Sequence, residues 1–259
     1  MLASAPAGVI GGVSYVVLGE GGPVTVFAHG LGGSIAETRP LATRVAGTRV
    51  LLDFRGHGDS AVQPEGWDYD TLADDLLAVA DAVGADQAVG LSLGAGALLR
   101  ALSRNPDRFR TLAFVLPAAI DATRRDGATE RLHRLGAAIT AQDAPAVAAV
   151  LLEELPAAVR DRRGVELLVL RRAQQLVTKP APAPAREDRP LRDRSLLAAI
   201  SAPALVITQE HDALHPADLG RSLADGLGAR HIALPEGGVF WTACREMQDA
   251  LAHHLAQGA

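Results

Sequence analysis

The sequence contains a single cysteine, Cys244, among 259 residues, so it cannot form an intrachain disulfide. It also lacks an excess of basic charge. The formal net charge of −5 gives no electrostatic reason to expect a nucleic-acid or membrane-surface partner. No apolar run is long enough to span a bilayer, and residues 1–10 lack the basic start and apolar stretch of a secretory signal. We therefore expect a cytoplasmic protein with a small-molecule substrate, and the sequence leaves a homodimer open.

Aromatic residues and lysines are scarce, whereas alanine, arginine and glycine are abundant, which suggests a high-GC bacterial source. Short apolar runs recur along the chain, as is typical of strands buried on both faces of a parallel sheet. They follow an edge segment at 9–18 and span residues 23–28, 49–53, 87–91, 112–116, 204–208 and 230–234. Helical patterns separate them at 69–83, 94–103, 216–227 and 242–256. This alternation predicts an α/β fold with a mostly parallel sheet flanked by helices.

One segment, residues 120–199, interrupts the alternation because it has only helical periodicity. A Pro-Ala tract at 179–185 predicts a stiff loop inside it. We expect residues 1–119 and 200–259 to form the core and residues 120–199 to form a helical cap over the sheet. The apolar stripe of the cap consists of Leu, Val and Ala, so the pocket beneath it should be mainly apolar.

The strongest motif is Gly90-Leu91-Ser92-Leu93-Gly94, which follows an apolar run and precedes a helical pattern. This strand–turn–helix context is the one that a nucleophile elbow requires. A serine on such a sharp turn needs small neighbours, and the following helix dipole favours a developing negative charge. The motif therefore predicts Ser92 as a nucleophile.

A second motif, residues 29–34 (HGLGGS), comes just after a predicted strand. We interpret it as an oxyanion loop, in which the backbone N–H groups of Leu31 and Leu93 point to one place above Ser92. His29 is interpreted as a residue that braces this loop. A third motif, residues 53–60, contains two glycines that permit a tight turn, and we interpret it as structural.

These three motifs, in this order and spacing, resemble the α/β-hydrolase superfamily. The resemblance is closest to small bacterial esterases, 3-oxoadipate enol-lactonases and C–C hydrolases. It implies the α/β-hydrolase fold and activity on small acyl compounds without a cofactor or metal. It also implies that Asp212, in the loop after the next-to-last strand, is the catalytic acid. The alternative for Asp212 is a turn residue or a helix cap before Pro216.

The expected histidine after the last strand is missing, because Val239 occupies its position. Valine cannot accept the serine proton, and loss of the histidine alone costs about a millionfold in turnover in a well-studied triad. An experimental replacement is one explanation, although it usually introduces another residue type. A second is that another histidine acts as the base, for which His215 is the best candidate. The less suited histidines are His211, which should point away, His253 and His254 at the surface of the last helix, and His133 in the cap.

The third explanation is that the site has changed its chemistry. Three functions therefore remain: a hydrolase of a small ester, lactone or activated acyl compound, a cofactor-free lyase, cyclase or isomerase, and a protein that only binds its ligand. If Val239 faces Asp212, burial without a partner should raise the pKa of that carboxyl. Replacing Val239 with histidine should then raise esterase activity.

Overall fold

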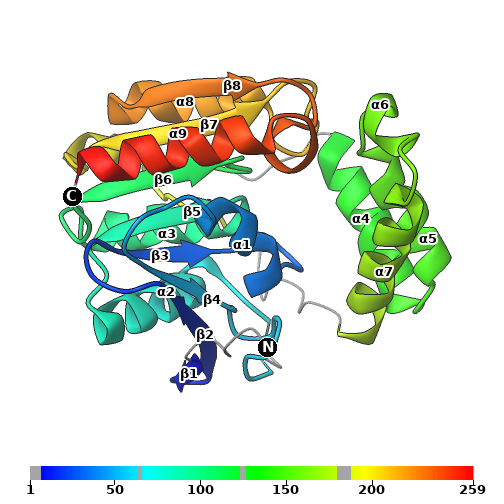
Figure 1. Ribbon diagram of the computed structural model, residues 1–259, viewed down its shortest axis with the longest axis horizontal. Coiled ribbons are helices and arrows are strands. Elements are labelled where there is room, and N and C mark those ends of the chain that lie inside the picture. Colours follow the sequence, from blue (N-terminus) through cyan, green and yellow to red (C-terminus); the bar gives the residue numbers. More distant parts are fainter. Residues whose placement is uncertain (1–6, 63–65, 123–126, 180–187, 259) are drawn as a thin grey trace.

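The computed structural model describes residues 7–62, 66–122, 127–179 and 188–258. Within these residues the chain forms an eight-stranded sheet in the order β1-β2-β4-β3-β5-β6-β7-β8 (Figure 1). The pairs β1–β2 and β2–β4 are antiparallel, and every other pair is parallel. The strands are β1 (Ala7–Ile10), β2 (Val13–Leu18), β3 (Val24–Ala28), β4 (Thr48–Leu52), β5 (Gln87–Leu91), β6 (Thr111–Val115), β7 (Ala204–Gln209) and β8 (Arg230–Leu234). The mostly parallel sheet predicted from the apolar runs is confirmed.

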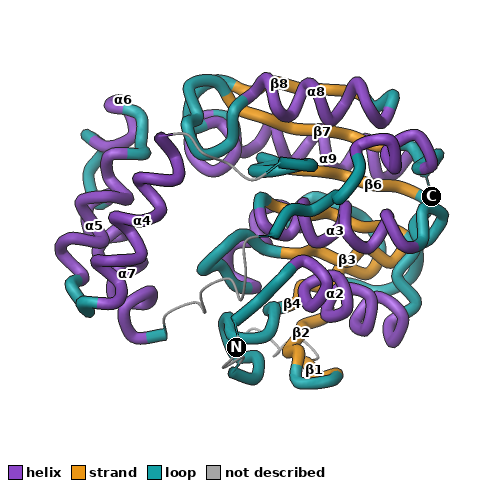
Figure 2. The backbone as a smooth tube through the Cα atoms, turned by 180° about the vertical axis from the view of Figure 1, so that it is seen from behind, coloured by secondary structure: helices purple, strands orange, loops and turns teal. Residues whose placement is uncertain are grey.

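Helices cover both faces of the sheet, as Figures 1 and 2 show from opposite sides. Buried residues of α1 and α9 pack on one face of the sheet, and buried residues of α2, α3 and α8 pack on the other. These helices are α1 (Ile35–Ala42), α2 (Tyr69–Val83), α3 (Leu93–Arg104), α8 (Ala217–Leu227) and α9 (Cys244–Gln257). The sheet is thus buried on both sides, which explains why β5 and β6 are apolar without alternation.

In the described part of the chain between β6 and β7, four α-helices lie together beyond the end of the sheet (Figure 2). They are α4 (Gly127–Thr140), α5 (Ala144–Glu153), α6 (Ala157–Arg160) and α7 (Val165–Thr178). Their buried residues form a cluster of their own, which includes Val147, Val159 and Leu176. The Pro-Ala tract expected at 179–185 falls almost entirely outside the described residues. We refer to α4–α7 as the cap helices.

The segment that returns from the cap helices is attached to the core by Arg100, whose side chain is buried. Its Nε donates to the carbonyl of Pro190 at 2.7 Å, and its guanidinium contacts the carboxylates of Asp70 and Asp188. A buried guanidinium requires such partners, because its charge is costly to remove from water. This network fixes where the chain re-enters the sheet before β7.

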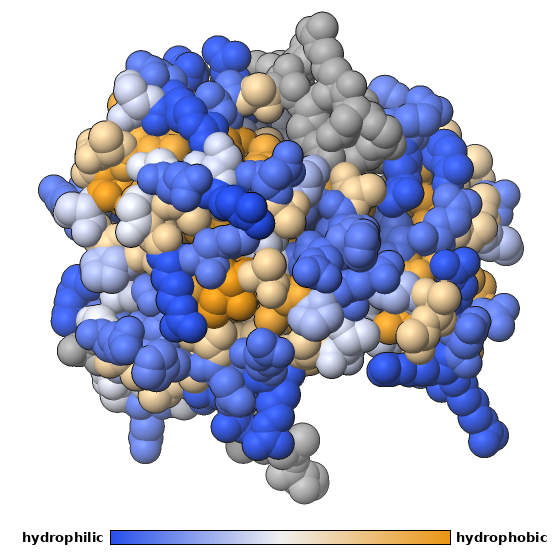
Figure 3. Space-filling view, turned by 90° about the horizontal axis from the view of Figure 1, so that it is seen from above, coloured by the Kyte–Doolittle hydropathy of each residue, from blue (hydrophilic) through white to orange (hydrophobic). Residues whose placement is uncertain are grey.

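Side chains on the surface seen from above in Figure 3 are mostly hydrophilic, and apolar ones lie in separate small groups. Among the described residues, no helix combines the length and the apolar character needed to cross a lipid bilayer.

Candidate active site

Ser92 lies on the tight turn between β5 and α3, with φ 51° and ψ −108°. This backbone conformation is strained for a residue with a side chain. The turn depends on the flanking glycines: a Cβ on Gly90 would lie 2.6 Å from the Gly94 carbonyl oxygen, and one on Gly94 would lie 2.5 Å from the Ala28 carbonyl oxygen. The Ser92 N–H donates to the carbonyl of Val115 in β6 at 2.9 Å, which fixes the turn on the sheet.

His215 contacts both residues that the sequence singled out. Its Nε2 lies 2.9 Å from the Ser92 Oγ, and its Nδ1 lies 2.9 Å from the Asp212 Oδ2. Both side chains are largely buried, with 15% of His215 and 9% of Asp212 exposed. The structure therefore brings Ser92, His215 and Asp212 into one hydrogen-bonded chain, although Val239 occupies the position where the related motif has histidine.

The loop between β7 and α8 explains how histidine and aspartate can be only three residues apart. The Asp212 Oδ1 accepts the backbone N–H groups of Leu214 and His215, each at 2.9 Å. His211 adopts a positive φ of 57°, and Pro216 then precedes the first turn of α8. The Asp212 side chain thus organises the turn through one oxygen and holds the imidazole through the other.

The pKa of Asp212 is lowered, so the rise expected from the sequence is wrong. Burial alone raises the pKa of this carboxyl, but hydrogen bonds from His215 and Gln209 outweigh that effect. The expectation assumed an apolar neighbour, whereas the structure supplies an imidazole. Asp212 therefore stays ionised at neutral pH beside His215.

Val239 is fully buried in a π-helical turn, Gly238–Thr242, and packs in the core beside Leu234 and Met247. Its N–H donates to the Gln209 Oε1 at 3.2 Å, and the Gln209 Nε2 donates to the Asp212 Oδ2 at 2.8 Å. Gln209 thus connects the Val239 turn to Asp212. Gln209 was not among the predicted site residues, although a polar side chain at the end of a buried strand was an available signal.

Among the described residues, no other histidine has a hydrogen bond to the Ser92 side chain. His211, His133 and His253 are exposed. His254 is buried, contrary to the expected surface position, because α9 presents it to the sheet, where its Nε2 lies 2.9 Å from the Leu112 carbonyl. His57 is buried against His29, with ring centroids 5.0 Å apart, in the loop that the sequence analysis interpreted as structural.

The loop with the HGLGGS motif lies against Ser92, since a Cβ on Gly30 would be 3.4 Å from the Ser92 Cβ. The Gly30 carbonyl accepts from the His29 Nδ1 at 2.7 Å and from the Gly33 N–H at 2.9 Å. In a trans peptide the N–H of Leu31 points opposite to this carbonyl. The direction of the Leu31 N–H is thereby fixed, and Leu93 provides the first N–H of α3 beside Ser92. We call residues 29–34 the oxyanion loop.

His29 is fully buried, and its tautomer follows from its partners. Its Nε2 accepts the Phe54 N–H at 3.0 Å, so the ring proton resides on Nδ1 and is donated to Gly30. Burial, together with the nearby charge of His57, lowers the pKa of His29 to about 3. The imidazole is therefore neutral over the physiological range and acts as a fixed donor.

We expect His29→Asn to weaken folding most at neutral pH. Unfolded His29 titrates near pH 6.5 and folded His29 at about 3, so acidification between these values favours the unfolded chain. The variant should be destabilised by about 1–3 kcal/mol at pH 7, because Phe54 loses its acceptor. The difference in the free energy of unfolding between wild type and His29→Asn should shrink by about 1.4 kcal/mol per pH unit below pH 6.5.

Urea unfolding at pH 7, 6 and 5 measures that difference, with exposed His253→Asn as the control. A difference between wild type and His29→Asn that stays constant across these pH values would contradict the assignment of a neutral, buried His29.

A cavity of about 200 Å³ lies between the cap helices and the π-helical turn. Its lining is mainly apolar and comprises Leu151, Glu154, Leu155, Leu168, Val169, Arg172 and Trp241. Burial raises the pKa of Glu154 to about 7, and the charges of Asp212 and His215 also act on this carboxyl. Through Glu154, the lining of the cavity lies within electrostatic range of Asp212 and His215. We call this cavity the cap pocket.

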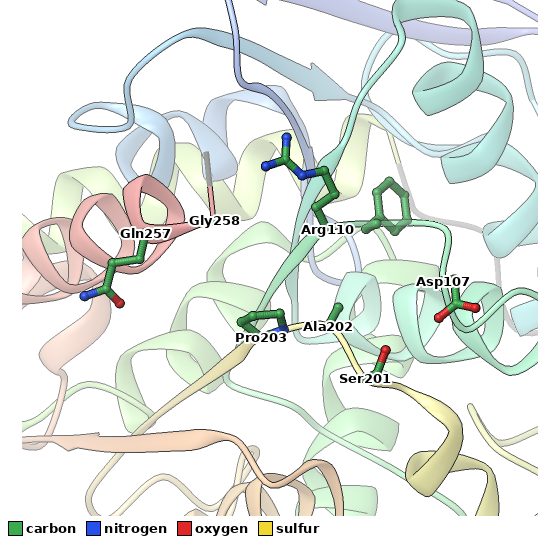
Figure 4. A pocket seen from close by; sticks show the side chains of 8 residues that line it. Asp107, Arg110, Ser201, Ala202, Pro203, Gln257 and Gly258 are labelled. Carbon is green, nitrogen blue, oxygen red and sulfur yellow. The ribbon is translucent and has the colours of Figure 1, made fainter.

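A second hollow, of about 440 Å³, opens at the opposite end of the sheet (Figure 4). It is lined by residues that precede β6 and β7 and by the end of α9, including Arg110, Pro203 and Gln257. It does not include Ser92 or its partners. Among the described residues, no group of three or more His, Cys, Asp or Glu side chains is arranged to hold a metal ion.

Comparison with known proteins agrees with this architecture. Residues 11–253 match the model of the alpha/beta hydrolase family. The chain is 29% identical over 230 residues to a dihydrolipoyllysine-residue acetyltransferase component of the acetoin cleaving system from Pseudomonas putida, covering 85% of this chain. The chain spans only 59% of the length of that relative.

Two solved structures resemble the whole chain. The esterase from Exiguobacterium antarcticum has a TM-score of 0.76 at 20% identity, covering 98% of this chain and 100% of that one. The enol-lactonase from Burkholderia xenovorans has a TM-score of 0.73 at 22% identity, covering 98% and 99%. At this identity the two structures establish the fold alone. Together with the family match, they confirm the predicted superfamily: the chain belongs to the alpha/beta hydrolase family.

Proposed function

We propose that this protein is a serine hydrolase of small esters, lactones or related acyl compounds. The observation that carries the proposal is the hydrogen-bonded chain from the Ser92 Oγ through His215 to Asp212, with 2.9 Å at each step. This is the arrangement that activates a serine hydroxyl as a nucleophile. The esterase and enol-lactonase among the structural neighbours are consistent with it.

In this mechanism, the Ser92 Oγ attacks the acyl carbon while the His215 Nε2 takes the hydroxyl proton. The carbonyl oxygen becomes an oxyanion, for which the N–H groups of Leu31 and Leu93 are the proposed donors. The imidazolium then gives its proton to the departing alkoxide, leaving an acyl group on Ser92. A water molecule attacks this acyl group by the same route, with His215 again taking and returning a proton.

Asp212 has two roles in this proposal. Its carboxylate fixes the proton of neutral His215 on Nδ1, which leaves Nε2 free to accept from Ser92. It then stabilises the imidazolium that forms during each half-reaction. The alternatives of non-hydrolytic chemistry and of binding alone rested on a missing base, and the position of His215 beside Ser92 favours hydrolysis over both.

We expect a preference for short acyl chains. The cap pocket, about 200 Å³, offers room for roughly six or seven water-sized groups. The kcat/KM for p-nitrophenyl butyrate should therefore exceed that for the decanoate by at least about tenfold, because methylene groups that do not fit into the pocket contribute no binding free energy. Initial rates with the acetate, butyrate and decanoate measure this preference, with Ser92→Ala as the inactive reference.

Enlarging the pocket provides the matched test. Trp241→Ala should extend activity towards the decanoate, whereas Leu167→Ala, at a residue 54% exposed on α7, should not. If wild type hydrolyses the decanoate as well as the butyrate, the cap pocket does not bind the acyl chain. If Ser92→Ala retains the wild-type rate, the proposed function itself is wrong.

A further inference from the structure

Two charged side chains from different parts of the fold hold the oxyanion loop. The Glu37 Oε2 in α1 accepts the Gly30 N–H at 3.0 Å. From the other side, the Arg172 guanidinium in α7 donates to the Gly32 carbonyl, across 140 residues of sequence. Leu31, the proposed oxyanion donor, lies between these two bonded glycines. The sequence motif itself supplies neither of these partners.

The fit around the loop is close. A Cβ on Gly33 would lie 2.0 Å from the Glu37 Oε2, and a Cβ on Gly32 would lie 3.0 Å from the Leu176 Cδ2 in α7. Gly32 also has a positive φ of 65°, which side chains rarely adopt. The loop therefore has its observed path only while α1 and α7 keep their places on either side of it.

Electrostatics connect the two charged residues. Burial raises the pKa of Glu37, while the Arg172 charge and the Gly30 N–H lower it in turn. A positive charge on His215, such as the imidazolium formed in the proposed mechanism, would also lower the pKa of this carboxyl. Arg172 thus stabilises the ionised form of Glu37, the form that accepts most strongly from Gly30. Because Arg172 also lines the cap pocket, the same side chain contacts the loop and the space proposed for substrate.

We propose that Arg172 is a positioning residue that couples the cap helices to the oxyanion loop. The inference rests on the proposed function, because it assigns Leu31 to the oxyanion. Arg172 acts through Gly32 and Glu37. When α7 is in place, the Leu31 N–H has the direction that a tetrahedral intermediate needs. Without the Arg172 contact, the loop keeps its hydrogen bonds on the α1 side and to His29 but loses its hydrogen bond to α7.

The test compares Arg172→Met, Arg172→Lys and the control Arg171→Met, which alters an exposed neighbour on α7. Methionine removes the donor and the charge, whereas lysine keeps a cationic donor. With p-nitrophenyl butyrate, Arg172→Met should lower kcat between about tenfold and a hundredfold, the range for a displaced oxyanion donor. The KM should change by less than about threefold, because the interaction operates in the transition state.

The inhibition constant (Ki) of a trifluoromethyl ketone provides a second measurement, one that a loss of protein stability alone would not change. Its hemiketal with Ser92 places an oxyanion in the hole, so its Ki for Arg172→Met should rise by the same factor by which kcat/KM falls. Arg172→Lys should recover most of both quantities, and Arg171→Met should match wild type. Glu37→Leu should produce the same pattern, and its combination with Arg172→Met should cost less than the sum of the two changes.

Unchanged kcat and Ki in folded Arg172→Met would overturn the coupling while leaving the proposed hydrolase intact. Equal losses in Arg172→Lys and Arg172→Met, with a lowered melting temperature in both, would also overturn it, since the contact would then serve stability alone. If wild type itself does not hydrolyse the ester, the proposed function is wrong and the inference is withdrawn with it.

Discussion

His215→Gln should lower kcat for p-nitrophenyl butyrate by about 10⁴-fold to 10⁶-fold, the cost of losing the base in a serine triad. Glutamine has a similar length and can contact Ser92, but it cannot take up the hydroxyl proton. Ser92 would remain on its turn and the oxyanion loop would be unchanged, so residual catalysis and substrate binding should persist. Steady-state kinetics with the purified variant measure the loss.

The matched control is His211→Asn in the same loop. His211 is exposed and has a positive φ, a conformation that asparagine tolerates, so this variant should keep wild-type activity. A His215→Gln enzyme that retains more than about a tenth of wild-type kcat would contradict the assignment of His215 as the base.

The structure also reverses the outcome expected for Val239→His. Its imidazole would enter a fully buried apolar position, while Gln209 already bonds to Asp212 on that side. We now expect no gain in activity and a loss of stability of about 1–3 kcal/mol, the usual cost of an unpaired buried polar group. A clear gain in esterase activity would mean that His215 is not the working base in solution.

The second large effect is expected for Asp212→Asn, which should lower kcat by about 10⁴-fold, as loss of the acid does in a well-studied triad. The carboxylate accepts the His215 Nδ1–H, whereas an amide can present its NH₂ group and favour the wrong tautomer. Asparagine keeps the side-chain size, so the turn at Leu214 and His215 should remain. Measurements of kcat across pH 6–9, together with the melting temperature, distinguish a loss of activity caused by the missing carboxylate charge from one caused by unfolding.

Asp218→Asn is the appropriate control, because Asp218 is an exposed carboxylate in the first turn of α8. It should match wild type within about twofold, the scatter typical of an exposed substitution. If Asp212→Asn behaves like this control, Asp212 only shapes its loop, which was the alternative reading of its position in the sequence.

Most of the core fold could be predicted because its signals are local. Strands β3–β8 lie within a residue of the apolar runs that predicted them, and α2 spans the predicted residues 69–83. Its ends also follow local rules, with Asp68 accepting the Thr71 N–H and Gly84 adopting a positive φ. Helix α1 was missed, because a short segment containing Pro40 has no clear periodicity.

The candidate site was predictable only in part. Ser92 and the oxyanion loop lie at strand ends that the sequence marks with glycines. The partnership of His215 with Ser92 spans 123 residues and depends on the path of one irregular loop, so no periodic pattern reveals it. The contact between Arg172 and Gly32 is equally remote in sequence and depends on how the cap helices pack. The His215 base was therefore one of several alternatives until the loop geometry was known.

The central claim is that His215 activates Ser92, and the rate of covalent labelling by a fluorophosphonate tests it most directly. Labelling needs the serine nucleophile and its base but no particular substrate. Intact-mass and peptide analysis of wild type should find one phosphonyl group on Ser92, and the His215→Gln protein should label at least about a thousandfold more slowly. Equal labelling rates for the two proteins, or a label on a residue other than Ser92, would contradict the account.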